Sequence, residues 1–411
     1  MQKLSKMLEN INYWAIILLP FSVAIAPGVS NTVIGIMIGS FLLEKLLKKE
    51  KLCALSLPLI IFGAFMLIGA FSFINSIDRG DSLKGMFKLL KYLMIFLVCS
   101  QNIKNREHFR RIAISSACAI SLIGIDALWQ IFSGRDFIRG NVLNGNIGLA
   151  RATASFPGCN AMGIYLTALT PLVAGVALFF QQIKIRVFFT GAALIGCLGV
   201  YLSLSRGAAL GLFISILFLS LIRKNKIIIT GLILLLTVYP FVMPKNIKEW
   251  AKSVNYNPLV MLTDNVRLSI YRNTIYMISQ HPVIGVGINT FSKNYGKYKL
   301  AAVEARTGTQ DTIYAHNSYL QMAGEVGLLG IGLFFIFLFF VLRGAWRAFK
   351  VNDEPFLKAM SISVFASIIA YLINSLTETS LYHSRLVMIF WFLVGLALAL
   401  GKISDRVVEK K

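Results

Sequence analysis

The sequence is poor in charged residues, and acidic residues are the scarcest. Of 411 residues, 14% are charged, with 18 Asp or Glu against 41 Lys or Arg. Soluble domains carry roughly a quarter charged residues, so this composition excludes an ordinary soluble fold. A net charge of +23 would suggest nucleic acid binding in a soluble protein. Here the basic residues flank apolar runs instead, so we expect a membrane protein that binds no nucleic acid.

Cysteine is also sparse. The five cysteines are scattered, and no two of them form a CxxC pair: Cys53, Cys99, Cys118, Cys159 and Cys197. This spacing supports neither a disulfide framework nor a zinc site.

What the chain has in abundance is long apolar runs. A membrane-spanning helix needs roughly 20 apolar residues, and on that basis the runs predict an all-α fold. The prediction is a polytopic membrane helix bundle of about 12 transmembrane helices, at 12–27, 29–44, 54–76, 84–100, 109–132, 157–180, 186–203, 206–222, 226–243, 320–342, 357–376 and 384–402. The first run ends in Ala24-Ile25-Ala26, like a cleavable signal peptide. We favour an uncleaved first span.

Lysine and arginine alternate in density between successive connections. They are dense at 3–6, 45–51, 104–111, 184–186, 223–226, 343–358 and 402–411. The intervening short loops hold only Arg79, Lys84, Arg135, Arg139, Arg151, Arg206 and Arg385. Basic residues accumulate on the cytoplasmic side of membrane proteins. The pattern predicts that both termini are cytoplasmic and that the sparse loops face outward.

One outward connection is far longer than the others. We divide the chain into residues 1–243 with nine spans, a loop over 244–315, and residues 316–411 with three spans and a cytoplasmic tail. Long structured loops usually carry function. Within the loop, Leu268, Tyr271, Ile275 and Ile278 have the spacing of one apolar helix face. A glycine turn over 282–287 should end that helix.

His316 opens the segment His316-Asn317-Ser318, just before the tenth span. Unpaired N–H groups at a helix start create a positive potential, which favours a neutral imidazole that can accept a proton. Such a ring suits a general base that activates a hydroxyl. The alternative is an interface histidine that caps the helix. The glycines at 324, 327 and 330 predict close helix packing, and Glu325 is a possible supporting residue of the site.

Two arginines lie on the same outward side. Arg206 stands in Ser205-Arg206-Gly207 at the start of the eighth span, and Arg267 heads the loop helix. Guanidinium groups bind phosphate oxygens in a bidentate manner, so the pair could hold a diphosphate leaving group. The alternative is that both anchor helix ends to lipid headgroups. Ser205 and Asn317 are possible supporting residues.

Other outward polar residues are less specific. Arg139 and Arg151 flank a loop rich in Gly and Asn, and they either hold a substrate or pair locally. Glu378, His383 and Arg385 are interpreted as solvated loop charges. Asp126, inside the fifth span, needs a polar partner that the sequence does not identify.

Taken in order, these motifs resemble the bacterial O-antigen ligase and polymerase superfamily. The resemblance rests on Ser205-Arg206-Gly207, on Arg267-Leu268 followed by the segment 281–287 and Phe291, and on His316-Asn317-Ser318 with Gly327 and Gly330. It covers the spacing from about residue 150 to 345, and the twelve-span layout with a large loop after the ninth span extends it over the whole chain. Tyr271 stands where many relatives have tryptophan.

The resemblance implies an inverting glycosyltransferase of the GT-C type in the bacterial inner membrane, with a periplasmic loop and active site. By the same resemblance we expect it to use no metal and no cofactor. The donor would be an undecaprenyl-diphosphate-linked glycan and the acceptor a sugar hydroxyl of lipid A–core. By the motif match, His316 would be the base and Arg206 and Arg267 would bind the diphosphate. Membrane lipids would surround the bundle.

Three alternatives stay open. An O-antigen polymerase would join two polyprenyl-linked glycans, and a protein O-oligosaccharyltransferase would attack Ser or Thr, usually with an extra outward domain. A secondary transporter would place its polar residues near the membrane midplane in paired halves. The length and the single large loop favour a ligase, and the polar groups at outward helix ends disfavour a transporter.

Overall fold

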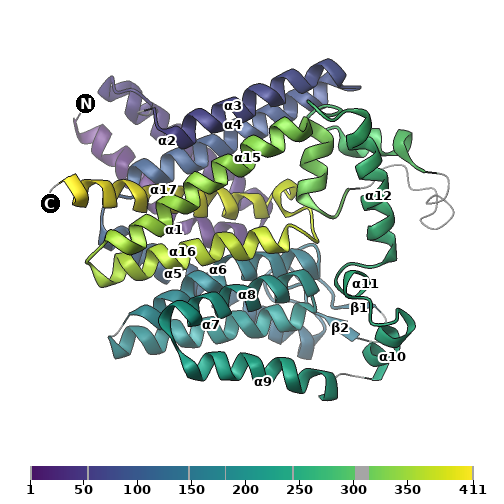
Figure 1. Cartoon of the computed structure of the whole chain (residues 1–411). Coiled ribbons are helices and arrows are strands. Elements are labelled where there is room, and N and C mark those ends of the chain that lie inside the picture. The colour runs from purple at the N-terminus through teal and green to yellow at the C-terminus, as the bar shows by residue number, and fades with distance from the viewer. Residues whose placement is uncertain are drawn as a thin grey trace.

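The computed structural model describes residues 2–52, 55–146, 149–180, 182–242, 245–300 and 314–409. Long helices packed along one another dominate it, and both termini lie at one end of the bundle (Figure 1). Ten of the described helices are long and apolar enough to cross a membrane. The predicted all-α polytopic membrane bundle is therefore confirmed. Below, the end that holds the termini is the terminus end, and the opposite end is the loop end.

Each predicted span corresponds to a described helix. These are α1 (Gln2–Ile25), α2 (Pro27–Lys48), α3 (Leu57–Phe71), α4 (Arg79–Asn102), α5 (Arg106–Ser133), α6 (Cys159–Phe179), α7 (Ile183–Ser203), α8 (Arg206–Arg223), α9 (Lys226–Val242), α15 (Ser318–Val351), α16 (Pro355–Asn374) and α17 (Leu386–Glu409). Two of these twelve helices are not among the ten that could cross a membrane by length and composition. They are α4, whose first half is rich in charge, and α9, whose apolar stretch is only Lys226–Val238.

The helix boundaries follow from local chemistry. Asp78 and Asn105 cap α4 and α5, each accepting a hydrogen bond from a backbone N–H three residues ahead. Such caps satisfy N–H groups that have no partner inside the helix. The last turn of α5 ends at Gly134, whose φ of 77° is a conformation that glycine adopts without strain.

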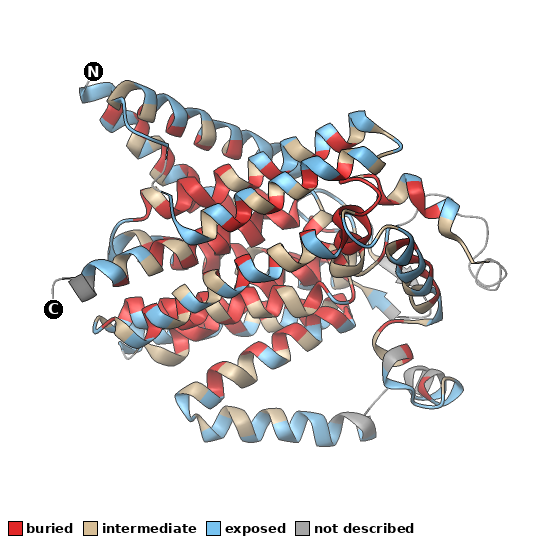
Figure 2. Ribbon diagram, turned by 45° about the horizontal axis from the view of Figure 1, so that its top comes forward, coloured by how far each residue is buried: buried red, intermediate tan, exposed pale blue. Residues whose placement is uncertain are grey.

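The core of the bundle lies around α6 and α16, most of whose residues are buried. Figure 2 shows the buried residues concentrated in the interior of the bundle. Every residue of α6 from Ala161 to Ala177 is buried, as expected for a helix that is apolar all round. A Cβ at Gly211 would lie 2.6 Å from the Ala370 carbonyl, so glycine lets α8 approach α16 closely. By contrast, α9 packs on α8 at the periphery and leaves most of its side chains exposed.

Short elements cover the loop end. They are η1 (Ser72–Asn75), β1 (Asn144–Asn146), β2 (Leu149–Arg151), α10 (Lys245–Ser253), α11 (Pro258–Leu262), α12 (Asn265–Gln280), α13 (Phe291–Asn294), η2 (Tyr295–Tyr298) and η3 (Ser380–Tyr382). The two strands form an antiparallel hairpin that the sequence analysis did not predict. Residues 243, 244 and 301–313 lie outside the described residues, so the predicted segment limits at 243/244 and 315/316 stay predictions.

The buried face of α12 is not the predicted one. The helix buries Ile270, Asn273, Thr274 and Met277, whereas Ile275 is 55% exposed. The periodicity was misleading because the polar Asn273 is buried with a partner: its amide donates to the Tyr295 hydroxyl at 2.8 Å. The glycine turn that follows is as predicted, with positive φ at Gly285 and Gly287.

Helix α15 is broken at Gly327, which has φ 70° and ψ −176°. The segment 282–287 fits into the break. Val286 N–H donates to the Gly324 carbonyl at 2.9 Å, and Leu328 N–H donates to the Pro282 carbonyl at 2.7 Å. A Cβ at Gly327 would lie 2.1 Å from the Val283 carbonyl oxygen. The interpretation of Gly327 as a helix-packing residue is thus wrong, because this glycine makes the break itself.

Candidate functional site

Arg206 is the first residue of α8, at the loop end. Its guanidinium donates to the Met261 carbonyl at 2.6 Å and to the Thr263 carbonyl at 2.7 Å. It therefore fastens the start of α8 to the last turn of α11 and to Thr263, which follows that helix. Ser205 precedes it in an extended conformation and is buried, but its side chain makes no capping hydrogen bond.

Arg267 lies in the first turn of α12. Asp264 caps this helix by accepting from the Arg267 N–H at 2.8 Å, and its carboxylate lies 3.4 Å from Arg267 Nε. One terminal nitrogen of the guanidinium donates to the Thr377 carbonyl at 2.5 Å. The other donates to the Glu378 carboxylate at 2.8 Å. The fork of Arg267 thus points at the loop between α16 and α17.

His316 directly precedes α15, and its backbone is left-handed with φ 47°. Its Nδ1 is buried and lies 3.6 Å from Glu378 Oε2. The Tyr271 hydroxyl donates to the His316 carbonyl at 3.0 Å. The helix cap is Asn317 rather than His316, because the Asn317 side chain accepts from the N–H groups of Tyr319 and Leu320.

Glu378 is the residue that joins these parts. It contacts Arg267 and His316 as described, and it accepts from the Asn160 amide at 2.6 Å. Its side chain is only 12% exposed, so the interpretation of Glu378 as a solvated loop charge is wrong. Burial alone would raise its pKa, but His316 and the Arg267 guanidinium outweigh burial and lower the pKa below 4.5. The carboxylate is therefore charged at neutral pH.

A third guanidinium belongs to the same site. Arg151, at the end of β2, donates to the Asn160 side-chain oxygen at 3.2 Å and to the Ser203 carbonyl at 3.2 Å. Arg206 experiences the positive charges of Arg267 and Arg151 and the negative charges of Asp264 and Glu378. We call the set Arg151, Asn160, Arg206, Asp264, Arg267, His316 and Glu378 the loop-end cluster.

The loop-end cluster has three guanidinium groups and two carboxylates, and one of those carboxylates also faces an imidazole. An excess of guanidinium donors in a partly buried setting favours a phosphate or diphosphate group. An imidazole whose Nδ1 faces a carboxylate presents its other nitrogen for proton transfer. The cluster can therefore combine binding of an anion with general base chemistry.

Two of the predicted supporting residues lie elsewhere. Glu325 is fully buried at the break of α15, where it accepts from the N–H groups of Asn289 and Phe291. It organises the start of α13 and does not contact the loop-end cluster. Arg139 donates to the Ser155 carbonyl at 3.4 Å in the loop after α5. The unidentified partner of Asp126 is the Phe137 N–H of that same loop, at 2.8 Å.

Arg385 is also not a solvated charge. It is 1% exposed and donates to the carbonyls of Val23, Ala24 and Ser155, and its guanidinium carbon lies 4.1 Å from the centre of the Phe156 ring. Burial, with a smaller effect of Arg139, lowers its pKa to about 10. Arg385 therefore holds together the end of α1, the loop before α6 and the start of α17.

Sequence reasoning missed Glu378 and Asn160 as parts of the site. Glu378 is the one acidic residue in the connection between α16 and α17, which lies on the same side as the three arginines. A single acidic residue on the same side as three arginines was the feature of the sequence that could have identified Glu378 as their partner. Nothing comparable marked Asn160, because amide side chains are common at helix starts.

The fold and the site define a multi-pass membrane protein with a cationic cluster and a histidine at one end of its helix bundle. The family model for O-antigen ligase matches residues 191–335, so this part of the chain is similar to that family and the predicted resemblance is confirmed there. The match includes Arg206, Arg267 and His316, and it indicates transfer of a lipid-linked glycan. Arg151 and Glu378 lie outside it.

Comparison with curated protein sequences gives no match. Among solved structures, the chain is similar to one from a study of the structural coordination of polymerization and crosslinking by a peptidoglycan synthase complex. The two share 14% identity with a TM-score of 0.47, over 84% of this chain and 97% of that one.

Proposed function

We propose that the protein transfers an undecaprenyl-diphosphate-linked O-antigen glycan to a sugar hydroxyl of lipid A–core. One observation carries the proposal: Glu378 contacts Arg267 with one carboxylate oxygen and faces His316 with the other. A cation for the leaving group and a base for the acceptor are thus held on one carboxylate. General base catalysis and stabilisation of a leaving anion are the two requirements of this transfer.

The reaction would proceed by a single displacement. His316 Nε2 takes the proton of the acceptor hydroxyl, and the acceptor oxygen attacks the anomeric carbon from the face opposite the diphosphate. The bond between that carbon and the diphosphate oxygen breaks, and its electron pair leaves with the diphosphate. The configuration at the anomeric carbon is therefore inverted, and the proton remains on the imidazole.

The guanidinium groups would bind the departing diphosphate. Arg206 and Arg267 are the primary ligands in this proposal, and Arg151 adds a third positive charge near Arg206. Developing negative charge is stabilised most by donors that are already oriented. The hydrogen bonds of Arg206 to Met261 and Thr263 provide such orientation. The energy of transfer is stored in the diphosphate ester, so the reaction needs no nucleotide.

Glu378 would orient the base. A carboxylate facing Nδ1 favours the tautomer with the proton on Nδ1, which leaves Nε2 free to accept a proton. The carboxylate also stabilises the imidazolium that forms. The 3.6 Å separation is longer than a hydrogen bond, and catalytic hydrogen bonds commonly shorten when substrate binds.

Orientation in the membrane follows from the charge distribution. The connections at the terminus end carry the dense Lys and Arg clusters, which supports a cytoplasmic location for both termini. The loop end, with the loop-end cluster, would then face the periplasm from the bacterial inner membrane. Lipid-linked glycan and lipid A–core could both reach a site at the periplasmic end of the bundle.

The broken helix α15 needs comparison with a transporter, because transporters often use discontinuous helices. In transporters the broken segment lines a substrate cavity near the midplane. Here the break is filled by the backbone of residues 282–287, and the charged cluster lies at the ends of helices. The geometry favours the enzyme.

The direct test reconstitutes the purified protein with a polyprenyl-diphosphate glycan and lipid A–core and measures glycosylated lipid. We expect His316→Ala to abolish product, with His281→Ala as the matched control in the same loop. Arg267→Lys should lose much of the activity because the fork is lost, whereas Arg272→Lys, on the exposed side of the same helix, should not. Normal turnover by His316→Ala would remove the proposed base from the mechanism.

A further inference from the structure

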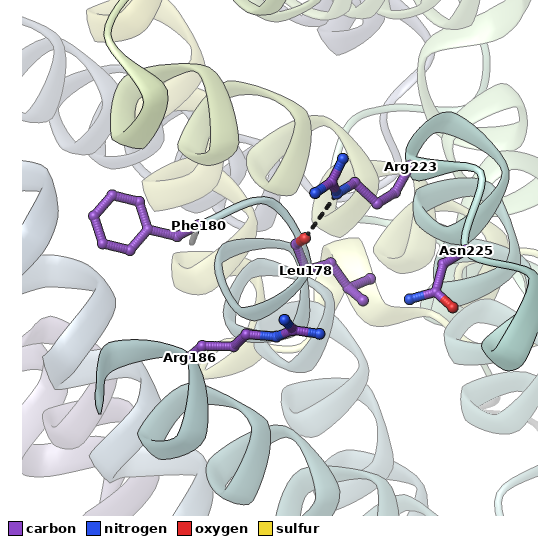
Figure 3. Close-up of a pocket in the computed structure, with 5 residues that line it drawn as sticks. All are labelled: Leu178, Phe180, Arg186, Arg223 and Asn225. Atoms are coloured by element: carbon purple, nitrogen blue, oxygen red, sulfur yellow. Dashed lines mark hydrogen bonds between the residues drawn. The ribbon is translucent and has the colours of Figure 1, made fainter. Parts of the chain in front are cut away.

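A second basic site lies at the terminus end, away from the loop-end cluster. The end of α6, the start of α7 and the end of α8 enclose an open cavity of about 370 Å³ (Figure 3). Its lining residues are Leu178, Phe180, Arg186, Arg223 and Asn225. The volume falls within the range of about 300–1,000 Å³ that is typical of small-molecule sites.

The charged groups of this cavity are two guanidinium donors, Arg186 and Arg223. Arg223 donates through Nε to the Leu178 carbonyl at 3.1 Å, which holds its guanidinium beside Leu178 in the cavity wall. Figure 3 shows the Arg186 guanidinium on the other side of Leu178, approaching from a different helix. Among the described residues, no carboxylate pairs with either arginine, and none lines the cavity. An anion is the matching ligand.

Apolar side chains adjoin the two arginines. Ile183 and Val187 on α7 are 66% and 63% exposed, and Leu221 on α8 is 54% exposed. Inside the cavity, Leu178 and Phe180 supply the apolar part of the wall. Guanidinium donors at the end of a helix bundle, next to exposed apolar side chains, match a molecule with an anionic head and hydrocarbon tails.

We infer that this cavity binds the phosphate headgroup of an anionic phospholipid. Arg223 and Arg186 clamp the phosphate oxygens, the Asn225 amide donates to the glycerol or headgroup oxygens, and the acyl chains run along Ile183, Val187 and Leu221. Basic pockets between membrane helices commonly hold such headgroups. The inference is independent of the glycan-transfer proposal, because none of its residues belongs to the loop-end cluster.

Native mass spectrometry of the full-length protein in detergent tests the inference. The protein is titrated with phosphatidylglycerol, phosphatidylcholine or inorganic phosphate. We expect retention of phosphatidylglycerol, with affinity at least about tenfold weaker in the double variant Arg186→Gln/Arg223→Gln. The double variant to lysine should recover only part of the affinity, because an ammonium cannot form the bidentate contact.

The matched control is Lys51→Gln/Arg343→Gln, which removes the same charge from exposed positions at the same end of the bundle. It should bind phosphatidylglycerol like the wild type. Equal loss in both double variants would show a general charge effect and overturn the site. Equal retention of phosphatidylcholine, or displacement of the lipid by an equal concentration of inorganic phosphate, would overturn the lipid assignment.

Discussion

Glu378→Gln is the most informative single substitution in this protein. The side chain keeps its size, and an amide oxygen can still accept from Asn160, but the negative charge is lost. Arg267 then retains the Thr377 carbonyl and the more distant Asp264, and His316 Nδ1 faces a neutral group. The substitution therefore removes electrostatics while leaving the packing intact.

Glu378→Gln should lower both the stability of the fold and kcat, and the loss of kcat should be the larger effect. Both side chains of the Arg267–Glu378 pair are more than four-fifths buried, and breaking a buried pair costs about 3–5 kcal/mol. Because Arg267 keeps its hydrogen bond to the Thr377 carbonyl and its contact with Asp264, we expect a smaller loss of stability, about 1–2 kcal/mol. Loss of the group that orients a general base should lower kcat by about 10²–10⁴-fold. A protein destabilised this little is still mostly folded, so instability cannot account for that loss.

The pH dependence provides a second measurement. The pKa of Glu378 is lower in the native protein than its ordinary value of 4.5. Its stabilisation is therefore complete above about pH 4.5 and disappears as pH falls through the native pKa. The difference in thermal midpoint between wild type and Glu378→Gln should be constant at neutral pH and shrink below about pH 4.5.

Glu249→Gln, which neutralises an exposed carboxylate on α10, is the control and should change neither kcat nor the midpoint. The reasoning about Glu378 is refuted if its Gln variant turns over at the wild-type rate. It is also refuted if kcat falls only in proportion to the unfolded fraction.

Three further substitutions test features around the site. Gly327→Ala should destabilise the protein by at least about 2–3 kcal/mol in a thermal scan, because φ is 70° and the new Cβ would meet the Val283 carbonyl. The control is Gly332→Ala on the same helix, which has open space around it and should be neutral. Arg385→Gln should lower the free energy of unfolding by about 3–5 kcal/mol, because it leaves buried carbonyls without donors. The control Arg79→Gln, at the exposed start of α4, should lower it by less than about 0.5 kcal/mol. Equal thermal midpoints of the two variants would contradict the bridging role of Arg385. Gly207→Ala should raise KM for the lipid-linked donor several-fold, because its Cβ would lie 2.0 Å from Thr377 Oγ1, next to Glu378. An unchanged KM would show that the loop between α16 and α17 tolerates displacement.

The fold was largely predictable because membrane spans are encoded locally. Apolar length sets each helix, and the alternation of Lys and Arg sets its direction, so neither depends on distant contacts. The motifs around Arg206, Arg267 and His316 were visible for the same reason. The charged partner Glu378 was not, because it lies 111 residues from Arg267 along the chain. Burial of a loop carboxylate depends on tertiary packing that no local window contains.

Other errors have the same physical origin. Periodicity assigned the wrong face to α12 because Asn273 satisfies its amide inside the loop, which makes a polar position a buried one. Gly327 was interpreted as a packing residue because a glycine spacing does not distinguish close approach from a break. The positive φ of Gly327 and the close approach of the Val283 carbonyl, more than forty residues earlier, require glycine there.

The break in α15 has a consequence for how the chain is assembled in a bilayer. Backbone groups interrupted at membrane depth need partners, since lipid offers none. Residues 282–287 supply those partners, and they are synthesised before Gly327. Under the orientation proposed above, residues 282–287 must cross the membrane before Gly327 does, so that their backbone is in place to pair with the later helix. With that orientation, insertion of α15 depends on earlier export of residues 282–287, and delayed export should leave newly made α15 open to proteolysis.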